Sequence, residues 1–147
     1  MEIAWQRVGA YVVCRDHDER LLLTRFEQAG NPDSGSWTLP GGGMEWGEQA
    51  RETALRELQE ETGYTATIGP LLGVTSTWLD AATTPRGAPG HSLQIVYGAH
   101  NFHGALKRDF ADDDSTVEAN WFALEVVREL RRVPLVDFGV TLRRDVQ

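Results

Sequence analysis

Two apolar runs near the start of the chain are separated by a short polar segment. Residues 8–14 and 21–26 are rich in β-branched and other apolar side chains, and Asp-His-Asp-Glu at 16–19 lies between them. This arrangement predicts two strands joined as a β-hairpin. The next segment, residues 27–36, contains Gly, Asn, Pro, Asp and Ser and predicts a loop.

The main helix is predicted where glycine and proline disappear from the sequence. Residues 47–62 consist mostly of strong helix formers. Gly63 follows them directly, at the place where a left-handed residue commonly ends a helix. Before this segment, residues 37–39 predict a short strand that ends at Pro40 and the three glycines after it.

The second half of the chain alternates between apolar runs and a loop rich in proline and glycine. Residues 66–79 and 93–102 predict two further strands. Residues 80–91 between them predict a long loop, for which a substrate lid and a disordered tip are both compatible interpretations.

The C-terminal part of the chain predicts smaller elements. Residues 121–122 indicate one more short strand, and residues 124–133 predict a helix that ends at Pro134, whereas residues 135–142 show only a weak pattern. The chain has no internal repeat and no linker. Residues 1–147 therefore predict a single domain of the α+β class, with a mixed sheet and flanking helices.

Composition and charge narrow the possible functions. The 147 residues are 41% apolar, which is enough for one packed domain. The formal net charge of −8 argues against a nucleic-acid partner, because such binding depends on Lys and Arg neutralising phosphates. An anionic substrate would need a divalent cation held by carboxylates to attract it.

Cysteine content and hydropathy indicate the cellular compartment in which the protein is expected. Cys14 is the single cysteine, which excludes an intrachain disulfide and a cysteine-rich zinc site. The N-terminal segment lacks the basic region and the unbroken apolar run of a signal peptide, and no apolar window reaches the length of a membrane span. We expect a cytoplasmic protein without a membrane partner.

Three glutamates share one face of the predicted main helix. Glu57, Glu60 and Glu61 are spaced at i, i+3 and i+4, which places them within an arc of about 100°. Each like-charge pair costs about 0.2–0.5 kcal/mol even in water. One interpretation is a solvated acidic face that pairs with Arg51 and Arg56, and the other is a carboxylate set that binds a cation. The apolar stripe beside the glutamates, which would dock the helix on the sheet, consists of Ala50, Ala54, Leu55 and Leu58.

The segment before the helix favours the cation. Residues 40–43, Pro-Gly-Gly-Gly, suit a loop that bends sharply and brings its amides or carbonyls close to a ligand. Carboxylates, a loop carbonyl and water are the ligands that Mg²⁺ and Mn²⁺ prefer. Such a cation typically bridges to substrate phosphates, so the sequence predicts a magnesium or manganese site.

The fixed residues around these glutamates resemble the Nudix box. Gly42 is followed after five residues by Glu48, and after seven more by the run RELQEETGY at 56–64. This matches the family pattern of Gly, five residues, Glu, seven residues and Arg-Glu-apolar-any-Glu-Glu-any-Gly-apolar at each fixed position. Tyr64 is larger and more polar than the aliphatic residue usual at the last position. The chain is therefore identified as a member of the Nudix hydrolases.

The resemblance implies a fold, a reaction and a set of ligands. The fold is an α/β/α sandwich around a mixed β-sheet, and the reaction is metal-dependent cleavage of a nucleoside diphosphate linked to another group. Glu60 and Glu61 would be metal ligands, and the carbonyl of Gly41 a further one. Glu57 would be another ligand or the base that activates water.

The remaining box residues are implied to support these ligands. Arg56 is similar to the box arginine that orients a glutamate through a salt bridge, and Glu48 to a residue close to the metal site. For Glu48, a first-turn acid favoured by the helix dipole is an equally compatible interpretation. Gly42 and Gly63 occupy the positions of the two box glycines.

Two candidates lie outside the box. Glu118 stands where many relatives carry another acid that binds metal or acts as the base, and the acidic run at 112–114 competes with it for this role. Arg25 is similar to an arginine that contacts substrate phosphate in some relatives, and an ordinary surface charge is an equally good interpretation.

The expected function is a metal-dependent pyrophosphohydrolase acting on a nucleotide. The substrate would be a nucleoside triphosphate, including oxidised forms, or an ADP-ribose-like nucleotide sugar. The alternative is a non-catalytic nucleotide-binding module, against which the intact set of Glu57, Glu60 and Glu61 argues. The expected partner is a nucleotide-type small molecule, and the chain is expected to be a monomer or a homodimer.

Overall fold

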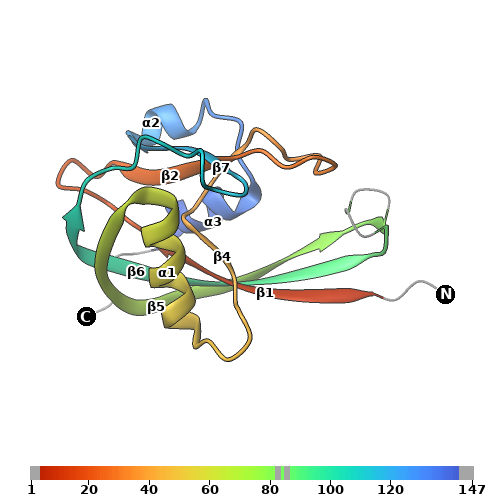
Figure 1. Cartoon of the computed structure of the whole chain (residues 1–147). Coiled ribbons are helices and arrows are strands. Elements are labelled where there is room, and N and C mark those ends of the chain that lie inside the picture. Colours follow the sequence, from red (N-terminus) through yellow and green to blue (C-terminus); the bar gives the residue numbers. More distant parts are fainter. Residues whose placement is uncertain (1–3, 82–83, 85–86, 143–147) are drawn as a thin grey trace.

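A computed structural model describes residues 4–81, 84 and 87–142 (Figure 1). The strands form two sheets, a mixed one in the order β4-β1-β6-β5 and an antiparallel one in the order β3-β2-β7. The elements along the chain are β1 (Trp5–Val13), β2 (Leu21–Phe26), β3 (Trp37–Thr38), β4 (Gly41–Gly43), α1 (Ala50–Thr62), β5 (Tyr64–Leu79), β6 (Gly90–Gly104), β7 (Thr116–Phe122), α2 (Leu124–Val127) and α3 (Pro134–Thr141).

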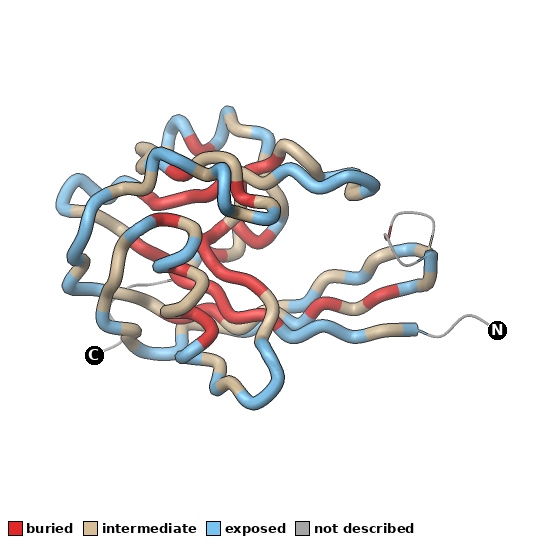
Figure 2. The backbone as a smooth tube through the Cα atoms, in the orientation of Figure 1, coloured by how far each residue is buried: buried red, intermediate tan, exposed pale blue. Residues whose placement is uncertain are grey.

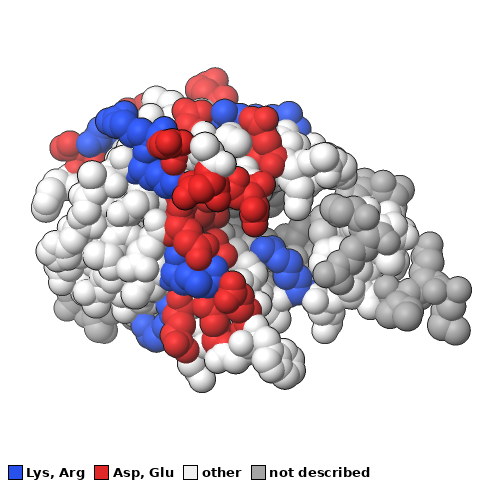
Figure 3. Space-filling view, in the orientation of Figure 1, with Lys and Arg blue, Asp and Glu red and all other residues white. Residues whose placement is uncertain are grey.

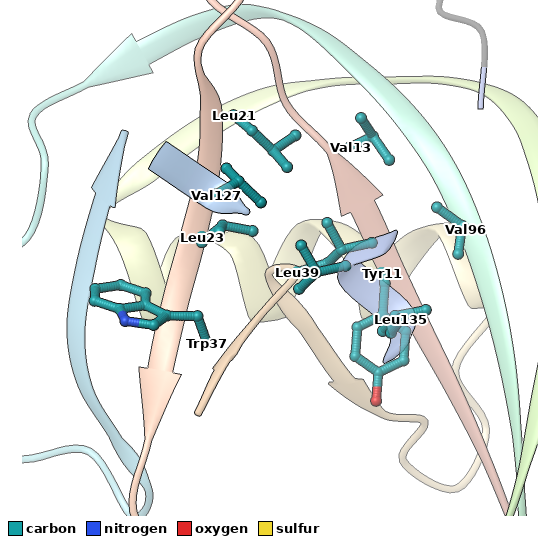
Figure 4. Packing of buried hydrophobic residues seen from close by; sticks show 10 residues of the cluster. Tyr11, Val13, Leu21, Leu23, Trp37, Leu39, Val96, Val127 and Leu135 are labelled. Carbon is teal, nitrogen blue, oxygen red and sulfur yellow. The ribbon is translucent and has the colours of Figure 1, made fainter. Parts of the chain in front are cut away.

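The alternation of side chains along β1 explains the layers. Ala10 and Val12 belong to a cluster that also contains Leu58 of α1, whereas Tyr11 and Val13 belong to a second cluster with residues of α2 and α3. Figure 4 shows Tyr11 of this second cluster beside Leu39 and Leu135. The sheets are therefore covered by α1 on one face and by α2 and α3 on the other, which confirms the predicted α/β/α sandwich.

Three strands extend past the helices as an arm, which we define as residues 5–9 of β1, 75–79 of β5 and 90–94 of β6 (Figure 1). β1 and β6 run parallel and pair from Trp5↔Gly90 onward, and β5 pairs antiparallel to the other edge of β6. Figure 2 shows the buried backbone concentrated between the helices and sheets, with mostly exposed or half-buried residues along the arm.

The main helix agrees with the sequence in length and in its end. α1 ends at Thr62, and Gly63 adopts the expected left-handed conformation with φ of 82°. Its first residue is Ala50, three positions later than predicted, because Gly47 has a φ of 88° and interrupts the helical backbone. The backbone N–H of Gln49 donates to the carboxylate of Glu52 at 2.9 Å and so stabilises the first turn.

Several local predictions are only partly confirmed or wrong. The hairpin predicted between β1 and β2 is short: Arg15 and Leu21 form an antiparallel bridge, and the N–H groups of Asp16 and Leu22 donate to the carbonyls of Arg20 and Cys14, each at 3.1 Å. β1 and β2 themselves belong to different sheets. The glycines after Pro40 form β4, because Gly41–Gly43 pairs with the edge of β1.

The C-terminal helix was predicted with the wrong bounds. α2 covers only Leu124–Val127, and Pro134 begins α3 rather than ending the preceding helix. Proline is well suited to this first position, where its missing N–H has no helical partner. Within the loop predicted at 80–91, residues 82–83 and 85–86 lie outside the described part of the chain, and Gly90 already belongs to β6. No helix among the described residues has the length and apolar character to cross a membrane.

Candidate active site

Arg56 joins Glu57 and Glu60 of α1 and Glu48, just before the helix, in one network. Its Nε donates to Glu48 at 2.7 Å and its Nη2 to the same carboxylate at 3.0 Å. Its Nη1 donates to Glu57 at 3.0 Å and to Glu60 at 3.3 Å. The guanidinium also reaches the carbonyl of Gly43 at 3.2 Å. Part of the repulsion between the crowded carboxylates is therefore offset by this one cation.

Glu48 is held as a carboxylate by its neighbours. Hydrogen bonding from Arg56, together with the backbone N–H of Glu45 and the hydroxyl of Thr53, lowers the pKa of Glu48 to about 2. A charge-assisted pair of this geometry fixes the orientation of both side chains. Glu48 thus fixes the guanidinium of Arg56, and the guanidinium in turn contacts Glu57.

Gly42 leaves the space that the Glu57 carboxylate occupies. A Cβ on Gly42 would lie 2.7 Å from the carboxyl carbon of Glu57 and 2.8 Å from one of its oxygens. The Glu57 side chain is only 17% exposed. Burial raises the pKa of Glu57, while the charge of Arg56 acts in the opposite direction. A raised pKa brings a carboxylate closer to the range in which it accepts protons efficiently near neutral pH.

Glu61 is tied to the strand that precedes the helix. One carboxylate oxygen accepts the backbone N–H of Gly41 at 2.8 Å, and the other accepts the hydroxyl of Thr116 at 3.2 Å. Gly41 has a φ of 150°, and a Cβ there would collide with the carbonyl of Ala10. Burial, and to a smaller extent the nearby Glu57, raises the pKa of Glu61 well above its ordinary value.

An acidic pocket of about 320 Å³ lies over the C-terminal half of α1. It brings the three helix glutamates together with the acidic run at 112–114, which is distant in the sequence. Lys107 lines the same pocket, with its Nζ 3.5 Å from Asp112 and 3.7 Å from Asp113. Figure 3 shows acidic side chains gathered in a band across this face of the molecule, interrupted by basic ones.

A larger cleft of about 480 Å³ adjoins the acidic pocket. It is lined by residues of the arm, among them Arg7 and Gln94, and by residues 31–33 and 133–135. Glu61 lines both the cleft and the acidic pocket. A ligand in the cleft can therefore present a phosphate to the carboxylates without leaving the cleft.

Two residues singled out in the sequence lie elsewhere. Arg25 on β2 faces Glu118 on β7, and its Nε donates to the Glu118 carboxylate at 3.0 Å. Arg25 also pairs with Glu27 at 3.2 Å. Among the described residues that line the acidic pocket and the cleft, neither Arg25 nor Glu118 is present.

Arg7 and Lys107 are cations at the site that sequence reasoning missed. Arg7 lines the cleft, its Nη1 donates to the Tyr11 hydroxyl at 3.3 Å, and its charge lowers the pKa of Glu57 to a small extent. The signal for Arg7 was its alternation with Trp5, Gly9 and Tyr11, which places it on one face of a strand. Lys107 has no comparable local signal.

The oxygen atoms at the site are of the chemical type that binds a divalent cation. Glu57, Glu60 and Glu61, the acidic run at 112–114 and the Gly41 carbonyl are hard oxygen donors of the type that Mg²⁺ and Mn²⁺ prefer. Within the part of the chain that the structure describes, no three acidic side chains are already gathered closely enough to hold a metal. A cation between them would favour the charged form of Glu61 and so offset both the cost of burying that charge and the repulsion from Glu57, the two causes that raise its pKa.

Several known proteins are similar to this chain in sequence and in fold. The ADP-ribose pyrophosphatase of Methanocaldococcus jannaschii is 36% identical over 115 residues, which are 78% of this chain and 61% of the relative. An RNA pyrophosphohydrolase of Roseobacter denitrificans is 46% identical over 117 residues, 76% of this chain and 69% of the relative. A crystal structure of a MutT NUDIX hydrolase from Burkholderia pseudomallei has a TM-score of 0.66 and 32% identity, and covers 82% of this chain and 84% of that one.

The family assignment rests on most of the chain. The chain spans less than two thirds of the first curated relatives that it matches, 61%, 41% and 43% of their lengths. The family model of the NUDIX domain, by contrast, matches residues 5–141. With this match over most of its length, and with Glu57, Glu60 and Glu61 lining the acidic pocket, the chain belongs to the NUDIX domain family.

Proposed function

We propose that the protein is a metal-dependent pyrophosphohydrolase that cleaves a diphosphate linkage in a nucleoside diphosphate derivative. The observation that carries this proposal is the position of Glu61, which lines both the acidic pocket and the cleft. Relatives named ADP-ribose pyrophosphatase, putative 8-oxo-dGTP diphosphatase and RNA pyrophosphohydrolase support this class of reaction. The substrate is a nucleoside triphosphate, including oxidised forms, or an ADP-ribose-like nucleotide sugar.

The helix glutamates hold the metal in this proposal. Glu60 and Glu61 are the ligands, with Glu57 and the Gly41 carbonyl beside them. Magnesium or manganese, when bound, neutralises the phosphate oxygens and favours deprotonation of the attacking water. Arg56 keeps Glu57 in place through its 3.0 Å hydrogen bond, and Glu48 keeps Arg56 in place.

Proton transfer is assigned to the carboxylates in the pocket. Glu57 accepts the proton of the attacking water, a role supported by the burial that raises its pKa. The acidic run at 112–114 supplies the additional acid in preference to Glu118, because that run lines the pocket and Glu118 pairs with Arg25.

Phosphate binding is assigned to Arg7 rather than to Arg25. The guanidinium of Arg7 lines the cleft and acts on the charge of Glu57. Arg25 is instead engaged by two carboxylates, those of Glu27 and Glu118. A planar guanidinium in this position can take two phosphate oxygens at once.

The test is hydrolysis by the purified protein in magnesium. The panel contains the common and oxidised nucleoside triphosphates, ADP-ribose, other nucleotide sugars and a 5′-triphosphorylated RNA, with release of phosphate, pyrophosphate and nucleoside monophosphate as the measurement. Glu60→Gln and Glu61→Gln should lower kcat by about 10²-fold or more, because each loses a metal ligand. Glu125→Gln, at an exposed acid of α2, is the matched control and should retain activity.

The outcomes separate the enzyme from the non-catalytic module. If no member of the panel is hydrolysed but nucleotides bind, the catalytic proposal fails and the module is favoured. If Glu60→Gln and Glu61→Gln keep near-normal rates, these carboxylates do not hold the metal. Calorimetric titration with Mn²⁺ provides a second readout, because both variants should bind the ion more weakly than Glu125→Gln does.

A further inference from the structure

The inner face of the arm forms an ordered floor for the cleft. The register of β1, β6 and β5 places Arg7, Ser92 and Thr77 opposite one another in one row across three strands. Residues directly opposite in a sheet project to the same face. In the next row inward, Gln94 lies between Gly9 and Thr75. Arg7, Thr77, Ser92 and Gln94 all line the cleft.

Two buried hydroxyl groups that line this cleft make no hydrogen bond to the described residues. In the described part of the chain, three buried side-chain polar atoms have no hydrogen-bond partner, on Thr24, His91 and Ser92. Two of these residues, Thr24 and Ser92, line the cleft, and their relative exposures are only 1% and 6%. Buried polar groups are almost always paired in folded proteins. A ligand that enters the cleft can supply the partner.

Gln94 adds a second polar group that is only partly used. The Thr77 hydroxyl donates to the side-chain carbonyl oxygen of Gln94 at 3.3 Å. This bond occupies the oxygen of the amide, and the amide nitrogen makes no hydrogen bond to the described residues. A primary amide carries both donors and acceptors. Ser92 and Gln94 together therefore offer donors and acceptors along one strand.

A flat apolar surface lies beside this polar row. The indole of Trp5 covers Gly90, because a Cβ on Gly90 would collide with the six-membered ring of the indole. The Trp5 Nε1 donates to the carbonyl of Ala88 at 3.1 Å, which fixes the ring orientation. Leu79, opposite Gly90 on β5, continues the apolar surface. A planar ring with a polar edge is the ligand shape that this combination accommodates.

We propose that Ser92, Gln94 and Thr77 form a nucleobase subsite, in which Ser92 and Gln94 hydrogen-bond the edge of the base and Trp5 flanks its face. The subsite rests on the proposed function, and it deepens that function by making the base a determinant of substrate choice. Arg7 lies at the β1 end of the row that it forms with Ser92 and Thr77, and its charge acts on Glu57. A phosphate bound by Arg7 would therefore lie between a base on β6 and the carboxylates of α1.

The test is equilibrium binding by the metal-free full chain. Tryptophan fluorescence and calorimetry measure the affinities of AMP, GMP, CMP and UMP against ribose 5-phosphate, which carries the same phosphate and sugar without a base. At least one nucleotide should bind about tenfold or more tightly than ribose 5-phosphate, because stacking and edge hydrogen bonds add to the phosphate contact.

Matched variants test whether the preference for nucleotides over ribose 5-phosphate depends on residues of the inner face of the arm. Ser92→Ala and Gln94→Ala should each lower the nucleotide preference by about three- to tenfold, the loss expected for one neutral hydrogen bond, with ribose 5-phosphate affinity unchanged. Ser76→Ala and Gln6→Ala remove the same side chains from the opposite face of the arm, where Ser76 pairs with Leu93 and Gln6 with His91. These controls should keep the preference.

The outcomes decide the subsite independently of catalysis. Equal affinity of the wild-type chain for nucleotides and ribose 5-phosphate, or weak binding of all of them, overturns the subsite. The same holds if Ser92→Ala and Gln94→Ala keep the preference, or if the outer-face controls lose it equally. Hydrolysis without base preference would sink the subsite and leave the proposed function standing. A preference that follows Ser92 and Gln94, without hydrolysis in magnesium, supports the subsite and removes the catalytic proposal.

Discussion

Replacement of Arg56 by alanine should destabilise the fold through the carboxylates that it leaves behind. The guanidinium makes two hydrogen bonds to Glu48, at 2.7 and 3.0 Å, and one to Glu57 at 3.0 Å. The side chains of Glu48 and Glu57 are only 16% and 17% exposed, so water reaches them poorly. Alanine would leave two half-buried carboxylates facing each other without a cation.

The expected loss is large relative to the stability of a domain. A hydrogen bond to a charged group contributes about 1.5–3 kcal/mol, and a domain of this kind is stable by about 5–15 kcal/mol. Arg56 is itself 24% exposed, so we expect a loss of about 2 kcal/mol. This corresponds to a fall in Tm of roughly 4–8 °C. Arg56→Lys keeps the charge but loses the forked geometry, and about half of the loss should remain.

The loss should depend on pH in one direction. Hydrogen bonding from Arg56 lowers the pKa of Glu48 from 4.5 to about 2. A carboxyl with a lowered folded-state pKa contributes stability that is present above its unfolded value and disappears as the pH falls through the folded value. The difference between wild type and Arg56→Ala should therefore be largest above about pH 4.5 and shrink toward pH 2.

Urea unfolding of the metal-free proteins between about pH 7 and pH 3 measures this difference. Arg51→Ala is the matched control, because Arg51 lies on the same helix and donates to the carbonyls of Ile68 and Gly69 rather than to carboxylates. Its effect should not change with pH. A loss below about 0.5 kcal/mol for Arg56→Ala at pH 7, or a loss that stays constant to pH 3, would refute the reasoning.

Three further changes test the site. Gly42→Ala should displace the Glu57 carboxylate and lower kcat/KM by about 10²-fold in a hydrolysis assay. Gly98→Ala is the control, because a Cβ at Gly98 would lie 3.6 Å from its nearest neighbouring atom, and it should leave kcat/KM within about twofold. Glu61→Gln should make the metal-free protein more stable at pH 7 in urea, because burial raises the pKa of Glu61, and the gain should vanish as the pH falls below its ordinary 4.5; a less stable variant at pH 7 contradicts this. Arg7→Ala should lower kcat/KM by about 10- to 100-fold with little change in Tm, and an unaltered KM and kcat would place the phosphate elsewhere.

The sequence predicted those elements whose conformation is determined by their own residues. α1 was predicted because helix formers fill it and Gly63 ends it with a left-handed backbone. The strand β4 was missed because glycine has low strand propensity, and Gly41–Gly43 is extended only through pairing with β1. Pro134 was interpreted as a stop because proline ends helices and also begins them, and the sequence alone does not distinguish the two positions.

The residues of the candidate site likewise fall into those that a local sequence pattern indicates and those that only the fold brings together. The glutamates of α1 were singled out by helical spacing and by a resemblance in sequence, and Gly42 by that resemblance alone. The space that Gly42 leaves for the Glu57 carboxylate became evident only in the structure. The association of the acidic run at 112–114 with Glu61 depends on the path of the chain after β6 and on the packing of Thr116 against α1. The pairing of Arg25 with Glu118 depends on the register of β2 and β7. Such contacts between distant segments have no counterpart in a local pattern.

The arm has a consequence for how this protein can diversify. Thr77 and Gln94 are half-buried polar side chains and Ser92 is a small one, so replacing them removes little buried apolar surface. The residues proposed for the metal chemistry are concentrated instead around α1 and its network with Arg56. In the proposed arrangement, base recognition and metal chemistry therefore use separate sets of positions. Combinatorial libraries restricted to Thr77, Ser92 and Gln94, with Arg7 kept, are the direct route to altered selectivity in an otherwise unchanged fold.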